Sequence, residues 1–135
     1  MDKKVLRRLE FHKVLEQLAS FAGSPLGKER GMELEPVDDL GTISRWQKET
    51  SEGRELLRLD PTAEVGGWKD IRVQIKRADR GAVLEPEELA AVADTLTAGS
   101  LLKNFLQERQ ERYPLLSELS FSLASLPELE KEIKR

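Results

Sequence analysis

The sequence has no cysteine and few aromatic side chains. Cysteine is absent from its 135 residues, and aromatic residues make up 5% of them. The first absence excludes disulfide bonds, thiolate nucleophiles, iron–sulfur clusters and zinc sites of the cysteine type. With so few aromatic rings, leucine has to build the hydrophobic core, which favours helices over sheets.

Long apolar runs are also missing. The longest uninterrupted ones are a few residues, far short of the roughly 20 residues that a helix needs to cross a bilayer. The N-terminus runs from Met1-Asp2-Lys3-Lys4 into amphipathic sequence, without the apolar region of a signal peptide. We therefore expect a cytoplasmic protein with no membrane partner.

Charge is abundant, but neither sign dominates. Charged residues make up 35% of the chain, and 22 Lys and Arg against 25 Asp and Glu give a formal net charge of −3. The two signs are interleaved, which is typical of solvated helix faces. Tight binding to nucleic acid usually needs a concentrated basic surface. We therefore expect the chain alone to bind nucleic acid weakly or not at all.

The spacing of apolar residues indicates helices nearly throughout. They recur three and four positions apart, and no stretch alternates as a strand would. Pro and Gly divide the pattern into six or seven helices, and no internal repeat emerges. We predict an all-α fold, an irregular array of six to seven helices with one long connecting helix. Residues 1–135 form a single helical module, and its last helix stops mid-pattern at Arg135, as expected for an N-terminal fragment of a larger protein.

The first segment, from Asp2 to Ala22, carries two sets of apolar residues that do not share a face. At about 100° per residue, the set that ends at Leu9 lies opposite the basic residues, whereas the set that begins at Phe11 lies on the basic side. One straight helix cannot bury both sets against one core. We predict a break between Leu9 and Phe11.

Further signals divide the rest of the chain. Ser24-Pro25 predicts a capped helix start. Gly27 and Gly31, four residues apart, indicate either close approach of another backbone or glycines that the helix tolerates without a packing role. Caps and prolines predict the remaining elements. Asp38 or Asp39 caps a helix that runs to about Leu59, and a loop follows over 60–69. Asp70 caps a helix that Gly81 closes, and two further helices begin at Pro114 and Pro127. One apolar stripe on the helix before the loop comprises Leu40, Ile43, Trp46, Thr50 and Leu57. Trp46 is expected in the core, and Trp68 is left open between core and interface.

The longest helix is predicted from Pro86 to about Arg112. Its apolar stripe changes sides near Gly99-Ser100, so we expect its two halves to contact different partners and the helix to act as a connecting strut. Leu96 is expected to be central in the core.

No pattern in the chain indicates catalysis. The segment from Gly23 to Glu29 has the wrong glycine spacing for a phosphate-binding loop and a carboxylate where that loop needs a hydroxyl. His12 is the only histidine, so a metal site or a serine-type triad lacks partners, and it is interpreted as a boundary residue. The acidic run that begins at Glu85 suits a helix N-terminus. We expect no catalytic, cofactor-binding or metal-binding residue here.

The sharpest charged patch consists of Lys3, Lys4, Arg7 and Arg8. Three interpretations stay open: a solvated helix face, contact with a nucleic-acid backbone, or contact with an acidic protein surface. These four residues are the candidate contact site of the chain.

The order of several short segments resembles the N-terminal region of the bacterial MutS-II family, type-two MutS-like proteins that end in an Smr nuclease domain. These segments are Leu9-Glu10-Phe11, Ser24-Pro25-Leu26-Gly27-Lys28-Glu29, Glu49-Thr50-Ser51-Glu52, Glu55-Leu56-Leu57-Arg58-Leu59, Asp70-Ile71-Arg72, Arg77-Ala78, Gly81-Ala82-Val83-Leu84, Pro86-Glu87-Glu88-Leu89 and Thr95-Leu96.

The resemblance implies that the chain is part of a MutS-like core and lever region. The whole protein is then implied to be a homodimeric ATPase and endonuclease that uses ATP and magnesium. It would act on DNA or on collided ribosomes, in suppression of recombination or in ribosome rescue. All catalytic residues would lie downstream of Arg135, and the partners of the chain would be the clamp and ATPase regions of its own polypeptide. The alternative is a stand-alone helical protein-interaction module.

Overall fold

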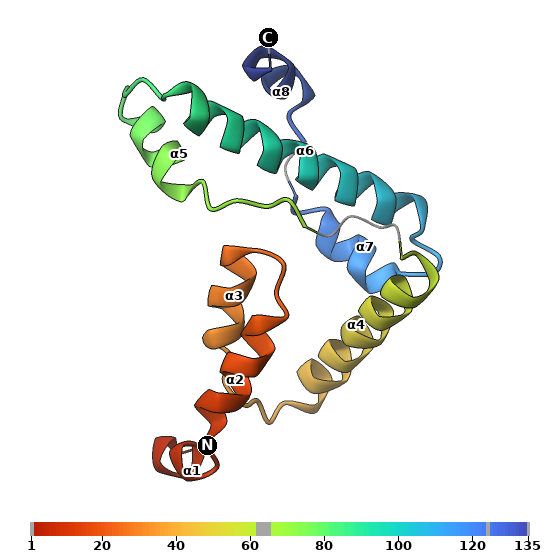
Figure 1. Ribbon diagram of the computed structural model, residues 1–135. Helices are drawn as coiled ribbons and strands as arrows, with labels where there is room; N and C mark the ends of the chain where they lie inside the picture. Colours follow the sequence, from red (N-terminus) through yellow and green to blue (C-terminus); the bar gives the residue numbers. More distant parts are fainter. Residues whose placement is uncertain (1, 62–65, 124, 135) are drawn as a thin grey trace.

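The computed structural model describes residues 2–61, 66–123 and 125–134, and in these residues the chain is helical with no strand (Figure 1). The all-α prediction is confirmed. These described residues form eight helices rather than six or seven, because several short helices of six to eight residues are separate elements. They are α1 (Lys3–Arg8), α2 (Phe11–Ser20), α3 (Pro25–Met32), α4 (Leu40–Leu59), α5 (Arg72–Asp79), α6 (Pro86–Glu108), α7 (Pro114–Ser120) and α8 (Pro127–Ile133).

The chain turns sharply between α1 and α2. Glu10 has a φ of 56°, in the left-handed region, which is the one positive φ of a non-glycine residue in the described chain. Such a conformation costs an L residue roughly 1–2 kcal/mol. The turn lies where the two apolar sets change faces, and α1 consequently points away from the axis of α2 (Figure 1).

Helices α2 and α3 form a hairpin. The start of α3 is capped as predicted, because the backbone N–H of Gly27 donates to Ser24 Oγ over 3.0 Å. The close approach expected at the glycines is confirmed at Gly31, which is buried. A Cβ at Gly31 would lie 3.7 Å from the Cα of Ala19 on α2, so the two backbones lie close together there.

A second group of helices meets around Tyr113, the residue before α7. Tyr113 is fully buried, and with Leu56 of α4 and Leu106 of α6 it forms the core of this group. The C-terminal ends of α4 and α6 and the start of α7 converge at this point (Figure 1). The partly buried hydrophobic residues packed on this core are Leu102, Phe105 and Leu116.

Helix α6 ends at Glu108, earlier than the predicted Arg112. The backbone N–H of Tyr113 donates to the carbonyl of Arg109 over 2.9 Å, and a turn replaces the last predicted helical residues. Tyr113 precedes Pro114, and a residue before proline is disfavoured in the helical conformation. The helix therefore ends before Tyr113, whose side chain lies in the core. At its other end α6 begins with a capping box between Glu85 and Glu88.

The two halves of α6 contact different neighbours. The first half lies against the 66–69 segment and α8: the Lys69 backbone N–H donates to Thr95 Oγ1 over 3.1 Å, and Thr97 bonds the Glu130 carboxylate. The second half contributes to the Tyr113 core. Leu96 was expected to be central, but it is only half-buried, whereas Ala93 and Gly99 are buried. Small residues therefore bring neighbouring segments close to this half of the helix.

Helix α4 corrects two expectations. Its start is capped by Asp39, which accepts from the Thr42 backbone N–H over 2.9 Å, as predicted. Trp46 was expected in the core but is 42% exposed. Leu57, assigned to the same apolar stripe, is 61% exposed, whereas its neighbour Leu56 is 3% exposed. The predicted apolar stripe is present on α4, but the other helices pack against the adjacent face, which carries Leu56.

The loop predicted over 60–69 is described only in part, because residues 62–65 lie outside the described residues. Asp60 ends α4, and the chain from Gly66 to Asp70 is not helical. Asp70 accepts from the backbone N–H of Arg72 over 3.2 Å, although Ile71 occupies the capping position of α5. Gly81, with a φ of 84°, follows the end of α5 as predicted.

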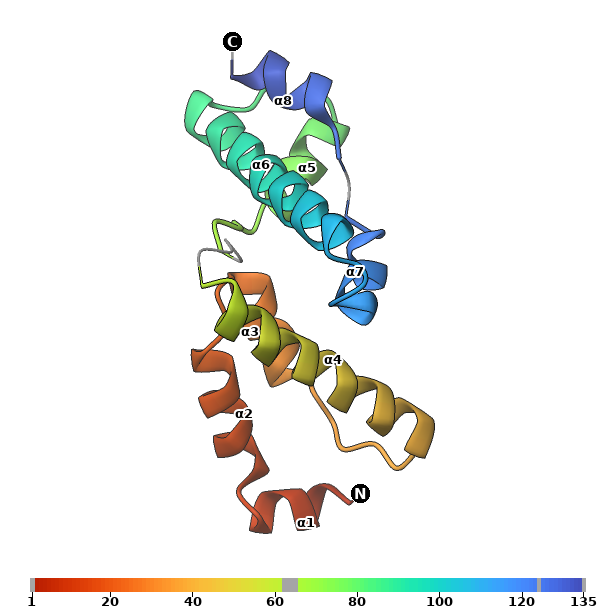
Figure 2. The same cartoon turned by 90° about the vertical axis from the view of Figure 1, so that its right-hand side faces the viewer.

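The molecule exposes more surface than a compact chain of its mass. A folded monomer of 15.3 kDa exposes about 7,100 Å² by the usual scaling with mass. This chain exposes 10,350 Å². Helices α1–α3 and α4–α8 form an elongated arrangement (Figure 2). None of the described helices has the length and apolar content needed to cross a bilayer.

Candidate partner-binding surfaces

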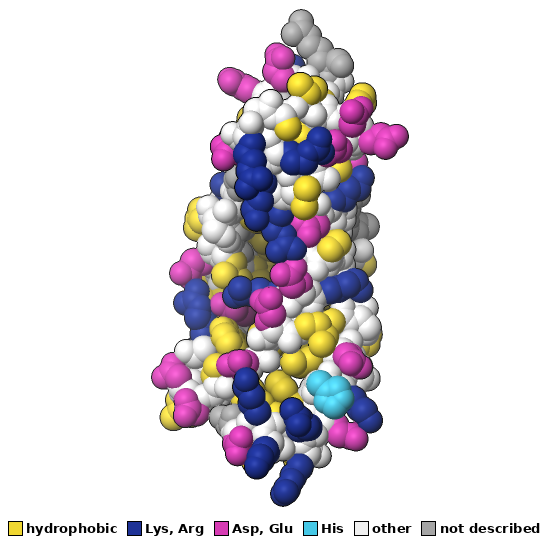
Figure 3. Space-filling model, turned by 90° about the vertical axis from the view of Figure 1, so that its left-hand side faces the viewer, with side chains coloured by type: hydrophobic (Ala, Val, Ile, Leu, Met, Phe, Trp, Pro, Cys, Tyr) yellow, Lys and Arg dark blue, Asp and Glu magenta, His cyan; other side chains and the backbone are white. Residues whose placement is uncertain are grey.

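Helix α1 presents the basic patch that the sequence singles out. Lys3, Lys4, Arg7 and Arg8 are all exposed, and none of them forms an ion pair with another described residue. In Figure 3, basic side chains gather at the lower end of the face shown, beside the single histidine and hydrophobic side chains. The structure therefore places the four predicted residues together.

A hollow of about 410 Å³ lies where α1 turns into α2. The Leu15 side chain is buried, Leu6 and Phe11 are half-buried, and the charged residues at the rim are exposed. His12, the expected boundary residue, is exposed. The hollow thus combines apolar walls with a basic rim. Its lining residues are Lys3, Leu6, Arg7, Phe11, His12 and Leu15.

A second surface follows α4 and exposes several large apolar side chains among polar ones. Leu40, Trp46 and Leu57 are exposed along this helix. Trp46 lines two hollows, one with Ile43 and Thr50 on its own helix and one with the 33–37 segment. Trp68, which the sequence does not assign to either the core or an interface, is half-buried.

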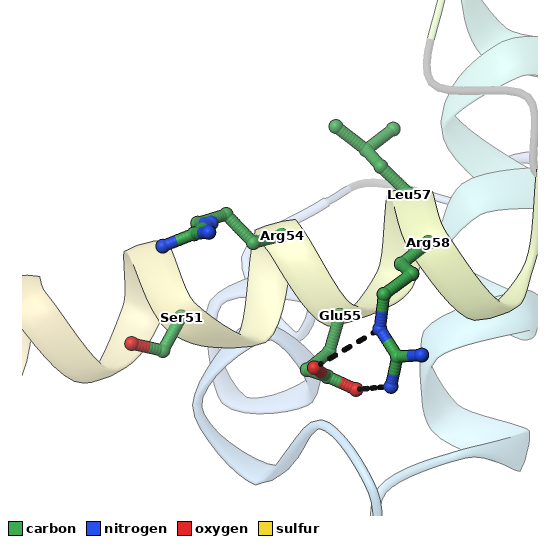
Figure 4. Close-up of a pocket in the computed structure, with 5 residues that line it drawn as sticks. All are labelled: Ser51, Arg54, Glu55, Leu57 and Arg58. Atoms are coloured by element: carbon green, nitrogen blue, oxygen red, sulfur yellow. Dashed lines mark hydrogen bonds and ion pairs between the residues drawn. The ribbon is translucent and has the colours of Figure 1, made fainter.

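The C-terminal half of α4 carries a shallow hollow of about 560 Å³, lined by Leu57 and by the polar or charged residues Ser51, Arg54, Glu55 and Arg58 (Figure 4). Arg58 and Glu55 form a two-bond ion pair, with Nη2 and Oε2 2.9 Å apart, while Leu57 points away from this pair. Their mutual bonds occupy the Glu55 carboxylate and keep its pKa below the usual range. This arrangement offers packing surface rather than acid–base chemistry.

A polar joint fastens α4 to α6 and α7. The Tyr113 hydroxyl donates to Asp60 Oδ2 over 2.7 Å, and Arg109 and Arg112 lie 3.8 and 3.7 Å from the same carboxylate. Burial of the ring, with the neighbouring Asp60 carboxylate, raises the pKa of Tyr113. The Glu52 carboxylate accepts from the first free N–H groups of α7, at distances of 2.9 to 3.1 Å. No pattern in the sequence indicates this joint.

An ionic bridge joins α3 to the start of α5. Arg72 Nη2 lies 2.7 Å from Glu29 Oε2 and 2.8 Å from Asp70 Oδ2. Its hydrogen bonds lower the pKa of Asp70 to about 2 and also lower the pKa of Glu29. The groups are solvent-exposed, so salt screens this bridge.

The segment from Gly23 to Glu29 uses its polar groups to build the fold. Ser24 caps its own helix, and the Lys28 ammonium donates to the carbonyl of Ala19 over 3.5 Å. These residues therefore do not fit a nucleotide phosphate. In the described part of the chain, no three or more carboxylate and histidine side chains are grouped as metal ligands.

Comparison with known proteins identifies relatives of the chain. No family model matches it. It is 65% identical over 134 residues to a protein named endonuclease MutS2 from Pelotomaculum thermopropionicum, a match that covers 99% of this chain and 17% of that relative. Proteins of the same name from Symbiobacterium thermophilum and Geobacillus sp. strain WCH70 are 42% and 41% identical, with all of this chain and 17% and 18% of theirs covered. The chain resembles the N-terminal region of MutS2.

The MutS-II resemblance inferred from the short segments is thereby confirmed. The chain spans about a sixth of the length of the MutS2 proteins that it matches, with 17% and 18% covered. The surfaces on α1 and α4 are accordingly surfaces of a MutS2-like segment.

Proposed function

We propose that the chain is a non-catalytic core segment of a MutS2-like protein, whose exposed apolar surface is covered by other parts of the same polypeptide. The observation that carries this proposal is the excess of exposed surface. The chain exposes about 3,200 Å² more than a compact monomer of its mass. A standard protein interface takes about 800 Å² from each partner, so the excess is large enough for extensive docking.

The chemistry of the exposed residues supports the same proposal. Among the described residues, six hydrophobic side chains are buried, whereas twenty-one large ones are exposed. On a monomer, extended apolar surface of this kind marks an interaction site. The α4 surface is the principal candidate, because it exposes the large apolar side chains of Leu40, Trp46 and Leu57 along one helix.

Within this segment we assign α6 the role of a lever. Its 23 residues span about 34 Å. Its first turn is held by the ion pair of Glu88 with Arg77 on α5, its middle by the 66–69 segment and α8, and its last turns by the Tyr113 core. A rigid helix fastened differently at its two ends transmits movement between the parts that hold it. The whole MutS2-like protein is, in this proposal, a homodimeric ATPase and endonuclease that uses ATP and magnesium and acts on DNA or on ribosomes.

Hydrogen–deuterium exchange tests both parts of the proposal. Amide exchange in α4 would be measured in the chain alone and in the MutS2-length protein that contains it. We expect slower exchange in α4 in the longer protein, because docking removes water from its exposed face. Addition of ATP and magnesium to the longer protein should then change exchange at the two ends of α6.

Two results would contradict the proposal separately. Identical exchange in α4 in both proteins would show that nothing covers its apolar face. If amide exchange in α6 does not change when ATP is added, the lever role of α6 is wrong, while the proposal of a core segment still stands. The alternative of a stand-alone interaction module draws its support from the unpaired cations on α1, and it predicts the first of these two results.

A further inference from the structure

We propose that the hollow between α1 and α2 binds an acidic peptide segment that inserts one large apolar side chain. The site is separate from the α4 surface and from α6, so it does not depend on the proposed function. Its volume of about 410 Å³ lies in the range of about 300–1,000 Å³ that ligand pockets occupy.

The walls of the hollow select an apolar group. Leu6 comes from α1, and Phe11 and Leu15 come from α2, so the turn at Glu10 brings the two helices together around the same space. A polar group inserted between these side chains would lose its hydrogen bonds to water, at a cost of about 1–3 kcal/mol. An aliphatic or aromatic side chain has no such penalty.

The rim of the hollow selects negative charge. Lys3 and Arg7 lie at the rim, one helical turn apart. The nearby carboxylates are already used: Asp2 accepts from the Lys4 backbone N–H over 3.1 Å, and Glu10 pairs with Lys13 over 3.2 Å. The basic side chains of α1 are left without a described acidic partner, although the chain as a whole has a net charge of −3.

A protein segment fits these features better than a nucleic acid does. The rim would pair with carboxylates on either side of an inserted side chain, which is the usual arrangement of an apolar centre with a charged periphery. The edges of a nucleic-acid base carry donors and acceptors, and the three apolar walls offer no partner for them.

The backbone at Glu10 provides a fixed angle for the site. A residue other than glycine in the left-handed region is strained, and such strain persists where the surrounding structure holds it. A turn that is already bent before binding would reduce the entropy lost when a partner docks.

Fluorescence anisotropy with three labelled probes and the full 135-residue chain tests the proposal. The first probe is a 12-residue peptide of Asp, Glu and Ser with a central Leu-Phe pair, the second has Ala-Ala at its centre, and the third is a 12-nucleotide single-stranded DNA. We expect the first peptide to bind at least about tenfold more tightly than either of the others, and to lose affinity as salt rises.

Variants of the chain locate the binding. Lys3→Gln with Arg7→Gln should weaken the first peptide about tenfold, because both rim charges are lost while the helix is kept. The matched control is Lys48→Gln on α4, an exposed cation far along the chain, which should leave binding unchanged. Far-UV circular dichroism of each variant shows that the fold is retained.

Three outcomes would overturn the proposal. Equal binding of the Ala-Ala peptide would show that the hollow takes no side chain. Tighter binding of the DNA would assign the patch to nucleic acid. Loss of binding in the Lys48 control as great as in the α1 variant would show attraction by general charge alone.

Discussion

Replacing Leu56 by alanine tests the position of the core, and the adjacent Leu57 provides a matched control. The two leucines are neighbours on α4, so the same substitution changes composition and helix propensity equally. Leu56 is 3% exposed and packs in the Tyr113 core, whereas Leu57 is 61% exposed. Periodicity alone assigned Leu57 to the apolar stripe. The sequence pattern therefore predicts that Leu57 is the more buried of the two leucines, whereas the structure buries Leu56.

The magnitude follows from burial. Leucine to alanine removes three carbon atoms, and at about 0.8 kcal/mol per buried methylene the transfer loss is about 2.4 kcal/mol for a fully buried side chain. A cavity adds to this loss, within the observed range of about 2–5 kcal/mol. The core at Leu56 has half-buried neighbours that can relax, so we expect about 2.5–3.5 kcal/mol. For Leu57 the same reasoning gives less than about 1 kcal/mol.

Urea denaturation of both variants, followed by far-UV circular dichroism, measures the difference in the free energy of unfolding. Leu56→Ala should shift the midpoint clearly and Leu57→Ala hardly at all, with equal denaturant dependence in each. Equal shifts in the two variants, or a larger shift for Leu57→Ala, would show that the Tyr113 core is wrongly placed.

Two further predictions concern the ionic bridge and the turn at Glu10. The lowered pKa of Asp70, about 2 against 3.8, means that its bond to Arg72 stabilises the fold above pH 4 and is lost as the pH falls from about 4 to about 2. Urea midpoints of the wild type and Arg72→Met should therefore differ at pH 5 and converge near pH 2, and a difference that persists at low pH would contradict this. At Glu10, valine should be less stable than glycine by about 1–2 kcal/mol, because glycine adopts the left-handed conformation freely. Equal unfolding free energies for the two variants would show that the turn is not strained in solution.

Local signals in the sequence predicted the helical elements well. Ser24 and Asp39 cap helices because their side chains reach N–H groups three residues away, and Pro86, Pro114 and Pro127 begin helices because proline suits a first turn. These interactions involve residues close together in the chain. The exposed basic face of α1 followed from the same helical spacing.

Contacts between distant residues were not predictable in this way. Tyr113 bonds Asp60 across 53 positions of sequence, and Arg72 bonds Glu29 across 43. The available signal was a single tyrosine directly before Pro114, where the helix must end. Nothing in the spacing indicated which aspartate it would contact.

The sequence by itself determined where most helices begin, which residues share a face of a helix, and the absence of thiol chemistry. Only the tertiary structure decided which face is covered: Leu56 is buried and Leu57 exposed, and Trp46 lies on the surface. The physical reason is that helical periodicity places side chains around one axis, whereas burial depends on the neighbours that the whole fold brings to that axis.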